Sequence, residues 1–498
     1  MKNNIFLYIF VFVCGAAVML LEMAASRLVA PYFGSSIFVW GNIIGVVLAA
    51  LSLGYYLGGK VADKYPKQEI LMLVVLIAGI YISFVPVFFK TIASKFVFTG
   101  NLSIDLLWII IFGSFLMSLI FFAPPIFLLG FVSPYTIRLI TKEVKNAGKI
   151  SGSLYGFSTM GSIVGTFLGS FLTVPFWGSR ETIYLSSFLL IFLSVVGLGK
   201  KKLYLLLILL LPILLYLYQD NQAIKENDQI IYEDDTMYQY LEISQNGNQK
   251  MMKNNEGTAI FSMYDPDNIL LNMYYDYFNI LPILNNKKQG DALIIGLAGG
   301  LISKQYNYFY PDIKLTGVEI DPGVITAANK FFDLEQQNIK VVEADGRVFL
   351  KNSNEQYDFI ILDAFSQSFY IPWHLTTLEF FQEIDSHLTN NGIVAFNTIG
   401  LKGGSSLLTS FNSTLKQVYD YVYIIPDQDR SNNIILAANH ELDFSNKTES
   451  KELTKLFNYS KNNYWEVKEV DKNKIFTDNR APVELLTEEM WLKRIFGI

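Results

Sequence analysis

The stretch DALIIGLAGG, residues 291–300, decides how the second half of the chain folds. Its apolar run at 292–295 predicts a buried strand, and the glycines that follow predict a tight turn. Gly296, Gly299 and Gly300 would let a ligand come close to the backbone there, because glycine has no side chain in the way. The next residues, LISKQYNYFY, have helical spacing. A strand, a glycine turn and a helix in this order are typical of a nucleotide-binding α/β fold.

The same alternation of strands and helices continues toward the C-terminus. Strands are predicted in KLTGVEID, NIKVVEADGRVFL, YDFIILDAF and GIVAFNTI, and helices in PGVITAANKFF and near 405–418. VYIIP and NIILAAN predict a closing hairpin. This pattern predicts a mostly parallel, doubly wound, Rossmann-like sheet with its ligand site at the carboxyl ends of the strands. Residues 219–285 instead contain short alternating segments with NG and NNEG turns, which predict a small antiparallel β domain.

Acidic residues stand at three successive strand ends, where this fold binds its ligands. Glu319 ends the second strand, 19 residues after Gly300, and is placed to accept hydrogen bonds from a ribose diol. Asp345 and Gly346 end the third strand, where a carboxylate can hold an adenine amino group. Asp363 ends the fourth and could take a proton from an amine or stabilise a cationic donor. The spacing fits an NAD enzyme or an adenosyl-sulfonium enzyme, but the turn reads G-x-A-G-G rather than G-x-G-x-x-G, which makes NAD the weaker choice.

Composition separates the chain into two halves. Of its 498 residues, 51% are hydrophobic and only 17% are charged. Residues 1–218 hold 15 Lys and Arg against 6 Asp and Glu, whereas the remainder holds 24 against 39. An acidic soluble half without a basic stripe argues against nucleic-acid binding. One cysteine, Cys14, and three scattered histidines predict neither a disulfide framework nor a metal site.

Seven apolar runs predict a helical, multi-pass membrane domain in a bacterial-type cell membrane, with the lipid bilayer as its partner. The runs lie at 5–30, 37–58, 69–89, 104–131, 154–176, 182–199 and 203–218. The first lacks a small-residue cleavage site, so we interpret it as a span rather than a signal peptide. The expected domains are therefore 1–218 in the membrane, 219–285 as the small β domain and 286–498 as the Rossmann-like domain.

Glycines at four-residue spacing predict where the membrane helices approach one another most closely. These are Gly41 and Gly45, Gly54 and Gly58, and then Gly161, Gly165 and Gly169. Seven spans would put all three basic loops on the N-terminal side, which the positive-inside rule makes cytoplasmic. A further crossing near 122–140, where prolines break the fourth run, would reverse the later loops. The sequence therefore leaves the side of the soluble half open.

Strings along nearly the whole chain resemble the membrane-fused spermidine synthase family, whose soluble half is similar to polyamine aminopropyltransferases. In the membrane half the resemblance rests on LLEMAASRLVAPYFGSSIFVWGNIIG, LSLGYYLGGKVAD, FLLGFVSPYTIRL and GKISGSLYGFSTMGSIVGTFLGSFL. In the soluble half it rests on YQYLEI, YYDYFNILP, LIIGLAGG, GVEIDP, EADGRVFL, YDFIILDAF and TDNRAPVELL.

The resemblance implies transfer of an aminopropyl group from decarboxylated S-adenosylmethionine to an amine such as putrescine. The donor would be a co-substrate, with no permanently bound cofactor. Position by position, the resemblance implies nucleoside contacts from Gln239 and Glu319, adenine contacts from Asp345 and Gly346, Asp363 as general base and Tyr274 as an active-site tyrosine. Tyr275 stands where soluble members usually have glutamine. Soluble relatives commonly form dimers or tetramers, so a homo-oligomer is possible.

Two positions depart from the family pattern. Gly299 replaces the aspartate that meets the donor's ammonium group, and Ser366 replaces a second aspartate that binds the incoming amine. These losses leave two alternatives: an S-adenosylmethionine-dependent methyltransferase, and a transporter or sensor that binds polyamine or nucleoside without turnover. The retained Asp363 favours an enzyme, because binding alone does not require a base at that strand end.

Overall fold

The computed structural model describes residues 2–96, 109–141, 143–219, 224–225, 229–255, 257, 260–365, 370–399, 405–428 and 432–496. The chain divides into two compact units. The first contains 1–227 and 237–240, and the second contains 228–236 and 241–498. We call them the membrane unit and the soluble unit and describe each by itself.

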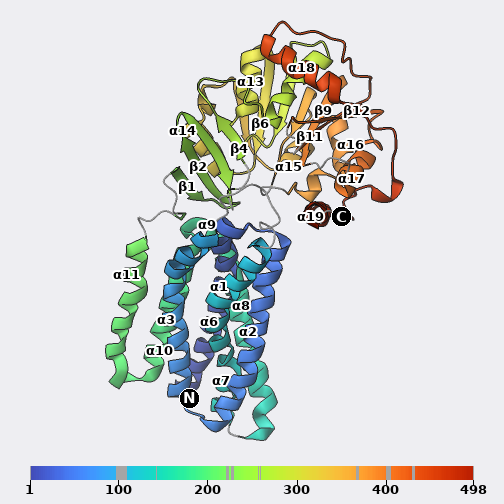
Figure 1. Ribbon diagram of the computed structural model, residues 1–498. Coiled ribbons are helices and arrows are strands. Elements are labelled where there is room, and N and C mark those ends of the chain that lie inside the picture. Colours follow the sequence, from blue (N-terminus) through green and yellow to red (C-terminus); the bar gives the residue numbers. More distant parts are fainter. Residues whose placement is uncertain are drawn as a thin grey trace. The chain divides into compact units, whose positions relative to one another are not determined.

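The membrane unit is a bundle of long helices (Figure 1). The main helices are α1 (Lys2–Phe33), α2 (Ile37–Lys64), α3 (Gln68–Ala93), α5 (Ser114–Phe121), α6 (Ala123–Gly130), α7 (Val132–Ile140), α8 (Ala147–Leu168), α10 (Ser179–Leu198) and α11 (Leu210–Gln219). Shorter pieces join them: η1 (Ser94–Phe96), η2 (Ile109–Gly113), η3 (Val144–Asn146), η4 (Gly169–Thr173), α9 (Val174–Trp177) and η5 (Lys200–Leu209).

Within the described residues, seven helices are long and apolar enough to cross a membrane, the number that the sequence predicts. The fourth predicted run is divided differently from the prediction. It breaks near Phe122, leaving a shorter apolar helix at Ile110–Phe121 and a candidate span at Ala123–Ile140. Pro124 and Pro125 begin the second piece, because proline is tolerated in the first turn of a helix but breaks a helix interior.

Glycines make room for the close contacts between these helices at two of the three predicted places. A Cβ on Gly161 would collide with the Phe12 carbonyl of α1, and one on Gly165 with the Ala16 carbonyl. A Cβ on Gly54 would likewise collide with the Phe127 carbonyl of α6. The interpretation of Gly41 and Gly45 was wrong, because a Cβ on either would meet no described atom within 4 Å.

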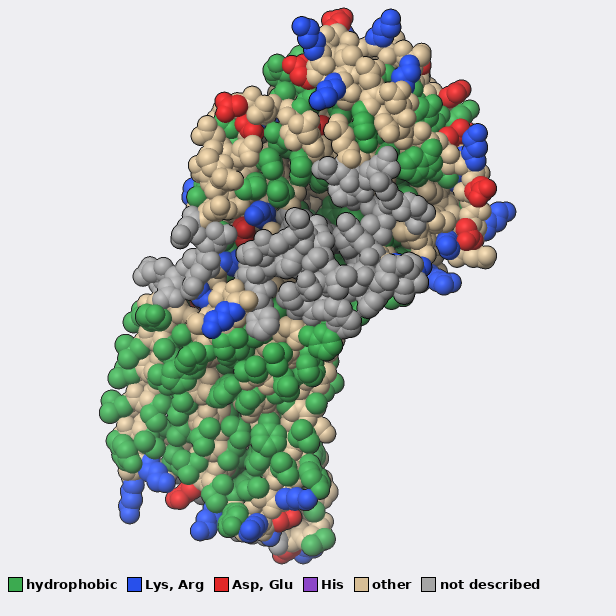
Figure 2. All heavy atoms as spheres, viewed as in Figure 1, with side chains coloured by type: hydrophobic (Ala, Val, Ile, Leu, Met, Phe, Trp, Pro, Cys, Tyr) green, Lys and Arg blue, Asp and Glu red, His purple; other side chains and the backbone are tan. Residues whose placement is uncertain are grey.

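The surface of the membrane unit is apolar along its middle, and charged side chains lie toward its two ends, including the end that holds the N-terminus (Figures 1 and 2). Ion pairs join the basic loops at the end that holds the N-terminus: Arg138 pairs with Asp63 at 3.0 Å, and Lys202 with Glu69 at 3.9 Å. The other end of the bundle holds the last residue of α11, where the Tyr184 hydroxyl near the start of α10 donates to Gln219. This distribution is compatible with a helical bundle that crosses a membrane several times.

The soluble unit begins with the small antiparallel sheet that the alternating segments predict. Its strands are β1 (Ile230–Asp235), β2 (Tyr240–Asn246), β3 (Gln249–Asn254) and β4 (Ile260–Tyr264), hydrogen-bonded in that order. The β2–β3 hairpin turns at Gly247 and Asn248, where Gly247 has a φ of 59°. A positive φ at this glycine fits the tight turn of a two-residue hairpin.

The larger sheet has eight strands in the order β12-β10-β11-β9-β8-β5-β6-β7. The strands are β5 (Gly290–Ile295), β6 (Ile313–Glu319), β7 (Ile339–Glu343), β8 (Tyr357–Leu362), β9 (Leu388–Ile399), β10 (Tyr421–Pro426), β11 (Asn432–Ala438) and β12 (Trp465–Glu466). Strands β7, β6, β5, β8 and β9 are parallel, while β11, β10 and β12 are joined antiparallel. The strand order reverses beside β5, the topological switch point at which such sheets bind ligands.

Helices cover both faces of this sheet (Figure 1). On one face pack α12 (Leu281–Leu284), α13 (Leu301–Phe309), α14 (Pro322–Phe331), α18 (Lys451–Asn463), η6 (Tyr274–Ile280) and η7 (Leu334–Gln336). On the other pack α15 (Gly346–Lys351), α16 (Leu378–Ser386), α17 (Ser406–Leu415), α19 (Val483–Phe496) and η8 (Trp373–Leu375), and η9 (Lys472–Lys474) lies beside α17. Side chains along β5 alternate between the two cores: Ile294 enters the first and Ile295 the second. The doubly wound fold that the sequence predicts is confirmed.

Candidate active site

Hydrogen bonds just beyond the named strands bring the carboxyl ends of four strands together. Gly296 donates its N–H to the Val318 carbonyl at 2.9 Å, and Asp363 donates to Ile295 at 2.9 Å. The Ala344 N–H donates to the Glu319 carbonyl at 3.0 Å. The ends of β5, β6, β7 and β8 therefore form one edge, which carries the predicted glycines and acidic residues.

The glycine turn after β5 needs both the freedom and the small size of glycine. Gly296 has a φ of 88°, and a Cβ there would lie 2.5 Å from the Asp363 carbonyl oxygen. Gly300 has a φ of 75° and begins α13 in the left-handed region. Ala298 also has a positive φ, 47°, although it is not glycine. The Gly300 N–H donates to the Leu297 carbonyl at 2.9 Å, so the positive φ angles let the chain turn tightly between β5 and α13.

Glu319 fastens this turn to the end of β6. Its Oε2 accepts the Ala298 N–H at 3.0 Å, while Oε1 accepts those of Ile320 at 2.9 Å and Asp321 at 3.1 Å. Burial raises the pKa of its carboxyl, and the backbone hydrogen bonds oppose that shift. A carboxylate can accept about four hydrogen bonds, so a ligand hydroxyl could still reach it. Glu319 thus has a structural role in addition to the ligand contact that the sequence suggests.

Asp363, at the end of β8, is held by two donors from distant parts of the chain. The Tyr274 hydroxyl at the start of η6 donates to its Oδ2 at 3.2 Å, and the Asn397 amide of β9 donates to Oδ1 at 3.0 Å. Asn397 is itself oriented by Asn432 of β11, which donates to its carbonyl oxygen at 2.9 Å. This chain of hydrogen bonds fixes which end of the Asn397 amide faces the carboxylate.

Burial raises the pKa of the Asp363 carboxyl to about 7, although the hydrogen bonds from Asn397 and Tyr274 act to lower it. Burial and the neighbouring Asp363 charge likewise raise the pKa of the Tyr274 hydroxyl, which therefore stays protonated and a donor. A carboxylate with a pKa near neutrality can accept a proton and release it again under physiological conditions. The pair has the protonation states that a general base and its orienting donor require.

Asp345 ends the connection after β7 and begins α15. Its Oδ1 accepts the Val348 N–H at 2.9 Å as a helix N-cap, while Oδ2 lies 3.3 Å from Nε2 of His374. Gly346 follows at the first helical position, where a Cβ would collide with the Ile295 side chain. The side chains of Asp345 and His374 are about one-third exposed, so the pair can be reached by a ligand.

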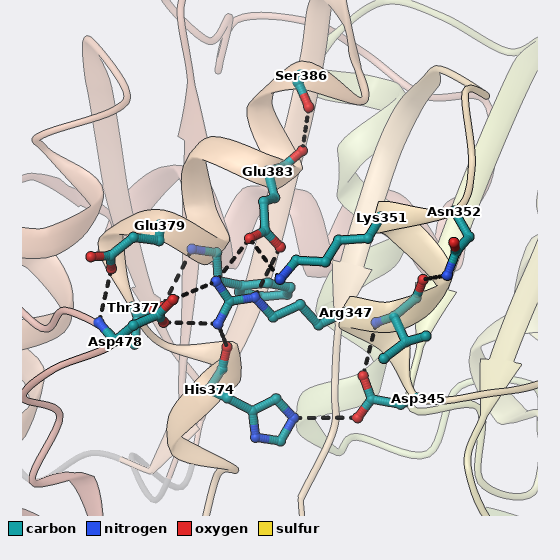
Figure 3. Close-up of polar contacts among 12 residues, drawn as sticks. Asp345, Arg347, Lys351, Asn352, His374, Thr377, Glu379, Glu383, Ser386 and Asp478 are labelled. Atoms are coloured by element: carbon teal, nitrogen blue, oxygen red, sulfur yellow. Dashed lines mark hydrogen bonds and ion pairs between the residues drawn. The ribbon is translucent and has the colours of Figure 1, made fainter.

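Arg347 anchors the segment that carries His374 (Figure 3). Its guanidinium pairs with Glu383 of α16 and with Asp478, through four hydrogen bonds of 2.8–2.9 Å. It also donates to the His374 carbonyl at 3.1 Å. Thr377 donates to the same Asp478 carboxylate at 2.7 Å. Because the Arg347 side chain is only 9% exposed, this network holds α15, α16 and the TDNRAP segment together beside Asp345.

Four other residues that the sequence predicts for the site are not among the groups described so far. A Cβ on Gly299 would lie 2.7 Å from Oγ of Ser262 and 2.9 Å from Phe332, so this position is already filled by its neighbours. The Tyr275 ring is buried and its hydroxyl donates to the Ile260 carbonyl, which is a structural contact. Gln239 belongs to the membrane unit in the division above. Ser366 lies outside the described residues.

Sequence reasoning missed two contributors, Asn397 and His374. Asn397 had a signal, because it is a polar residue inside the apolar strand GIVAFNTI and such a residue must find a partner. His374 had no such signal, because an isolated histidine in the sequence indicates at most a metal ligand. Its contact with Asp345 depends on a loop that the sequence does not place.

The doubly wound sheet, its glycine turn and the strand-end carboxylates define a Rossmann-like domain of the methyltransferase type. Residues 272–440 match the spermine/spermidine synthase domain family. The probable polyamine aminopropyl transferase of Bifidobacterium longum is 28% identical over 282 residues, which are 52% of this chain and 62% of that protein. The polyamine aminopropyltransferase of Vibrio vulnificus is 31% identical over 218 residues, 42% of this chain and 71% of the relative.

Polyamine aminopropyltransferase 2 of Aquifex aeolicus is 23% identical over 431 residues, 83% of both chains. The crystal structure of a probable spermidine synthase from Corynebacterium glutamicum has a TM-score of 0.38 at 19% identity, covering 45% of this chain and 85% of that one. The chain spans less than two thirds of the Bifidobacterium protein and more of the other two relatives. It belongs to the spermine/spermidine synthase family of polyamine aminopropyltransferases.

Proposed function

We propose that the protein is a membrane-bound aminopropyltransferase that uses decarboxylated S-adenosylmethionine as donor and an amine such as putrescine as acceptor. The observation that carries this proposal is the Asp363 carboxylate, held between Tyr274 and Asn397 with a pKa of about 7. It stands beside the glycine turn, at the edge where Glu319 and Asp345 would hold the donor's nucleoside.

In the proposed reaction the acceptor's amine nitrogen attacks the aminopropyl carbon next to the sulfonium. The new C–N bond forms as the C–S bond breaks, and sulfur keeps the electron pair and leaves as methylthioadenosine. The nitrogen then gives up one proton, which Asp363 takes. Most of the rate would come from holding the nucleophile in line with the C–S bond, because bound geometry removes the entropy cost of bringing the reactants together.

The test is product analysis by mass spectrometry with the purified full chain, an amine panel and each of the two donors. We expect methylthioadenosine and an amine heavier by one aminopropyl unit, and Asp363→Asn to lower kcat/KM roughly 10²- to 10⁴-fold. The base must be ionised, so wild-type kcat/KM should rise with pH through about 7, a limb that the variant lacks.

Asp385→Asn is the matched control. Burial also raises the pKa of Asp385, but this residue lies on α16 and accepts a hydrogen bond from Asn439, away from the site. Equal turnover in the Asp363 variant and wild type would refute the base assignment. S-adenosylhomocysteine as the product would move the activity to methyl transfer. Nucleoside binding without a product from either donor would make the protein a sensor or transporter.

Two physical arguments disagree about the side of the membrane on which the soluble unit lies. The basic loops share the end of the bundle that holds the N-terminus, and the positive-inside rule makes that end cytoplasmic. The chain leaves α11 at the other end, which would put the soluble unit outside. An adenosyl-sulfonium donor, however, is made inside the cell. C-terminal alkaline phosphatase and fluorescent-protein fusions decide between the two, since the first is active outside and the second is fluorescent inside.

A further inference from the structure

The His374 imidazole faces the Asp345 carboxylate, which the family resemblance places at the adenine (Figure 3). Asp345 Oδ1 accepts the Val348 N–H at 2.9 Å, while Oδ2 lies 3.3 Å from Nε2 of His374. Because a carboxylate only accepts hydrogen bonds, Nε2 is the donor of this pair. A carboxylate can accept about four hydrogen bonds, so the two partners fix its plane without using up its capacity.

The position of His374 is set by the same helix that Asp345 caps. Arg347, in the first turn of α15, donates to the His374 carbonyl at 3.1 Å. The turn η8, which carries the histidine, is closed by the Thr376 hydroxyl, which donates to the Trp373 carbonyl at 2.6 Å. Both members of the pair are therefore held by α15, and the imidazole is directed at the carboxylate without the help of a ligand.

The imidazole itself contributes little to the stability of the fold. Asp345 caps α15 through its other oxygen, and Arg347 holds η8 through the backbone of His374 rather than through the ring. The side chains of His374 and Asp345 are 34% and 30% exposed, and pairs in contact with solvent add little stability. A ring that is fixed on a carboxylate at a ligand-binding edge of the sheet therefore suggests a role in binding.

The oriented carboxylate can distinguish between purine bases. Adenine carries a 6-amino group, which donates hydrogen bonds, whereas hypoxanthine has a carbonyl oxygen in that place, which only accepts them. A carboxylate accepts from the first group and repels the second. Asp345 follows Ala344, whose N–H donates to the Glu319 carbonyl at 3.0 Å. The carboxylate thus lies at the strand end next to the one that would hold the ribose.

We propose that His374 is a specificity-determining positioning residue. Its imidazole holds the Asp345 carboxylate in the orientation that accepts the adenine amino group, and it thereby selects an adenosyl donor over an inosyl one. The choice of an adenosyl nucleoside rests on the proposed function. His374 acts through Asp345 on donor binding and takes no part in the proton transfer at Asp363.

The experiment is equilibrium dialysis of 5′-methylthioadenosine and of 5′-methylthioinosine against the full chain in detergent. Wild type should bind the adenosine form roughly tenfold or more tightly, because the inosine form loses a hydrogen bond to a charged group. His374→Leu should reduce this preference roughly threefold to tenfold by weakening the adenosine form alone. His374→Gln keeps an N–H donor and should restore part of the preference.

A double variant shows through which group His374 acts. Asp345→Asn keeps a residue that caps helices well, so α15 should remain, but its preference for the adenosine form should fall. Adding His374→Leu to it should cause no further loss, because the two changes remove the same arrangement. His387→Leu is the matched control, since its ring nitrogens contact the Glu383 and Ser353 carbonyls rather than a carboxylate, and it should keep the wild-type preference.

Steady-state kinetics supply a second measurement, in which His374→Leu should raise the KM for the donor and leave kcat near wild type. Equal weakening of both nucleosides together with a lower kcat would show a structural role and overturn the proposal. An unchanged preference in His374→Leu, or a wild type that has no preference or binds neither nucleoside, overturns it as well. A changed preference in a protein that forms no product supports this inference and refutes the proposed activity. Product formation with an unchanged preference does the reverse.

Discussion

Glycine serves the two units in different ways, and the contrast is clearest between the α1–α8 contact and the turn after β5. In the membrane unit, Gly161 and Gly165 have ordinary helical backbones and matter only because a carbonyl of α1 occupies the space of a side chain. In the soluble unit, Gly296 and Gly300 have positive φ angles as well as close neighbours. The first pair permits helix packing where no hydrophobic force drives association, and the second pair shapes a ligand site.

The charged side chains of the two units also differ, in how far they are exposed. In the membrane unit the Arg138–Asp63 pair lies at one end of the bundle, with side chains 47% and 75% exposed. In the soluble unit Arg347 is 9% exposed and holds two carboxylates at once. A charge that is costly in lipid can thus be used inside the soluble unit to join distant segments, provided that its hydrogen bonds are satisfied.

The largest effect should come from breaking the α1–α8 contact. Gly161→Leu would put a side chain where the Phe12 carbonyl lies, so the two helices must separate and lose their packing along several turns. We expect a loss of roughly 3 kcal/mol or more in the stability of the membrane unit. Amide hydrogen exchange of α1 and α8 in detergent would report it as lost protection.

Gly152→Leu on the same helix is the matched control, because a Cβ at Gly152 meets no described atom within 4 Å. It should leave protection near the wild-type level. If both leucine variants behaved alike, the close approach at Gly161 would not be what holds α8 against α1.

Sequence reasoning succeeded where a local pattern has one physical meaning. Four-residue glycine spacing predicted the contacts of Gly161 and Gly165, and the strand pattern predicted which ends carry Glu319 and Asp363. The same spacing misled at Gly41, because periodicity shows that a helix face is small but not that another helix covers it.

The rest of the site depends on contacts between distant segments. Asn397 reaches Asp363 across 34 residues, and Arg347 reaches Asp478 across 131. No local pattern contains such pairs, since they follow from the strand order and from the path of the C-terminal segment. The polar Asn397 in an apolar strand was the one sign that a buried partner exists.

The second largest effect should come from removing the buried charge of Arg347. Arg347→Met would leave Asp478 without its arginine and Glu383 with only Lys351, at a cost of roughly 2–3 kcal/mol in the soluble unit, less than for a fully buried pair because Asp478 is 40% exposed. Hydrogen exchange of the segment 477–482 should speed up. Lys351→Met, which removes the half-exposed lysine 3.5 Å from Glu383, should change stability by about 0.5 kcal/mol or less.

Arg347 holds the pKa of the Asp478 carboxyl below its usual range through its hydrogen bonds. A carboxyl whose folded-state pKa is lowered stabilises the fold above its unfolded pKa and loses that contribution as the pH falls. The difference between wild type and Arg347→Met should therefore shrink on acidification below about pH 4. A difference that stayed constant with pH would show that the arginine acts through packing alone.

The smallest effect separates the two properties of the site glycines. Gly247→Ala, in the open β2–β3 turn, tests positive φ alone, because a Cβ there meets no described atom within 4 Å, and should cost roughly 1 kcal/mol. Gly296→Ala adds the contact with the Asp363 carbonyl to a similar strain and should cost roughly 2 kcal/mol. The Gly296→Ala side chain must also push Asp363 away from its hydrogen-bond donors, Tyr274 and Asn397. Aminopropyl transfer should therefore fall roughly tenfold or more, while Gly247→Ala keeps full turnover. Equal activity in the two alanine variants would mean that the turn tolerates a side chain beside Asp363. The site would then need glycine only for its backbone angle, as the hairpin does, and the close approach of β5 to β8 would have no part in placing the base.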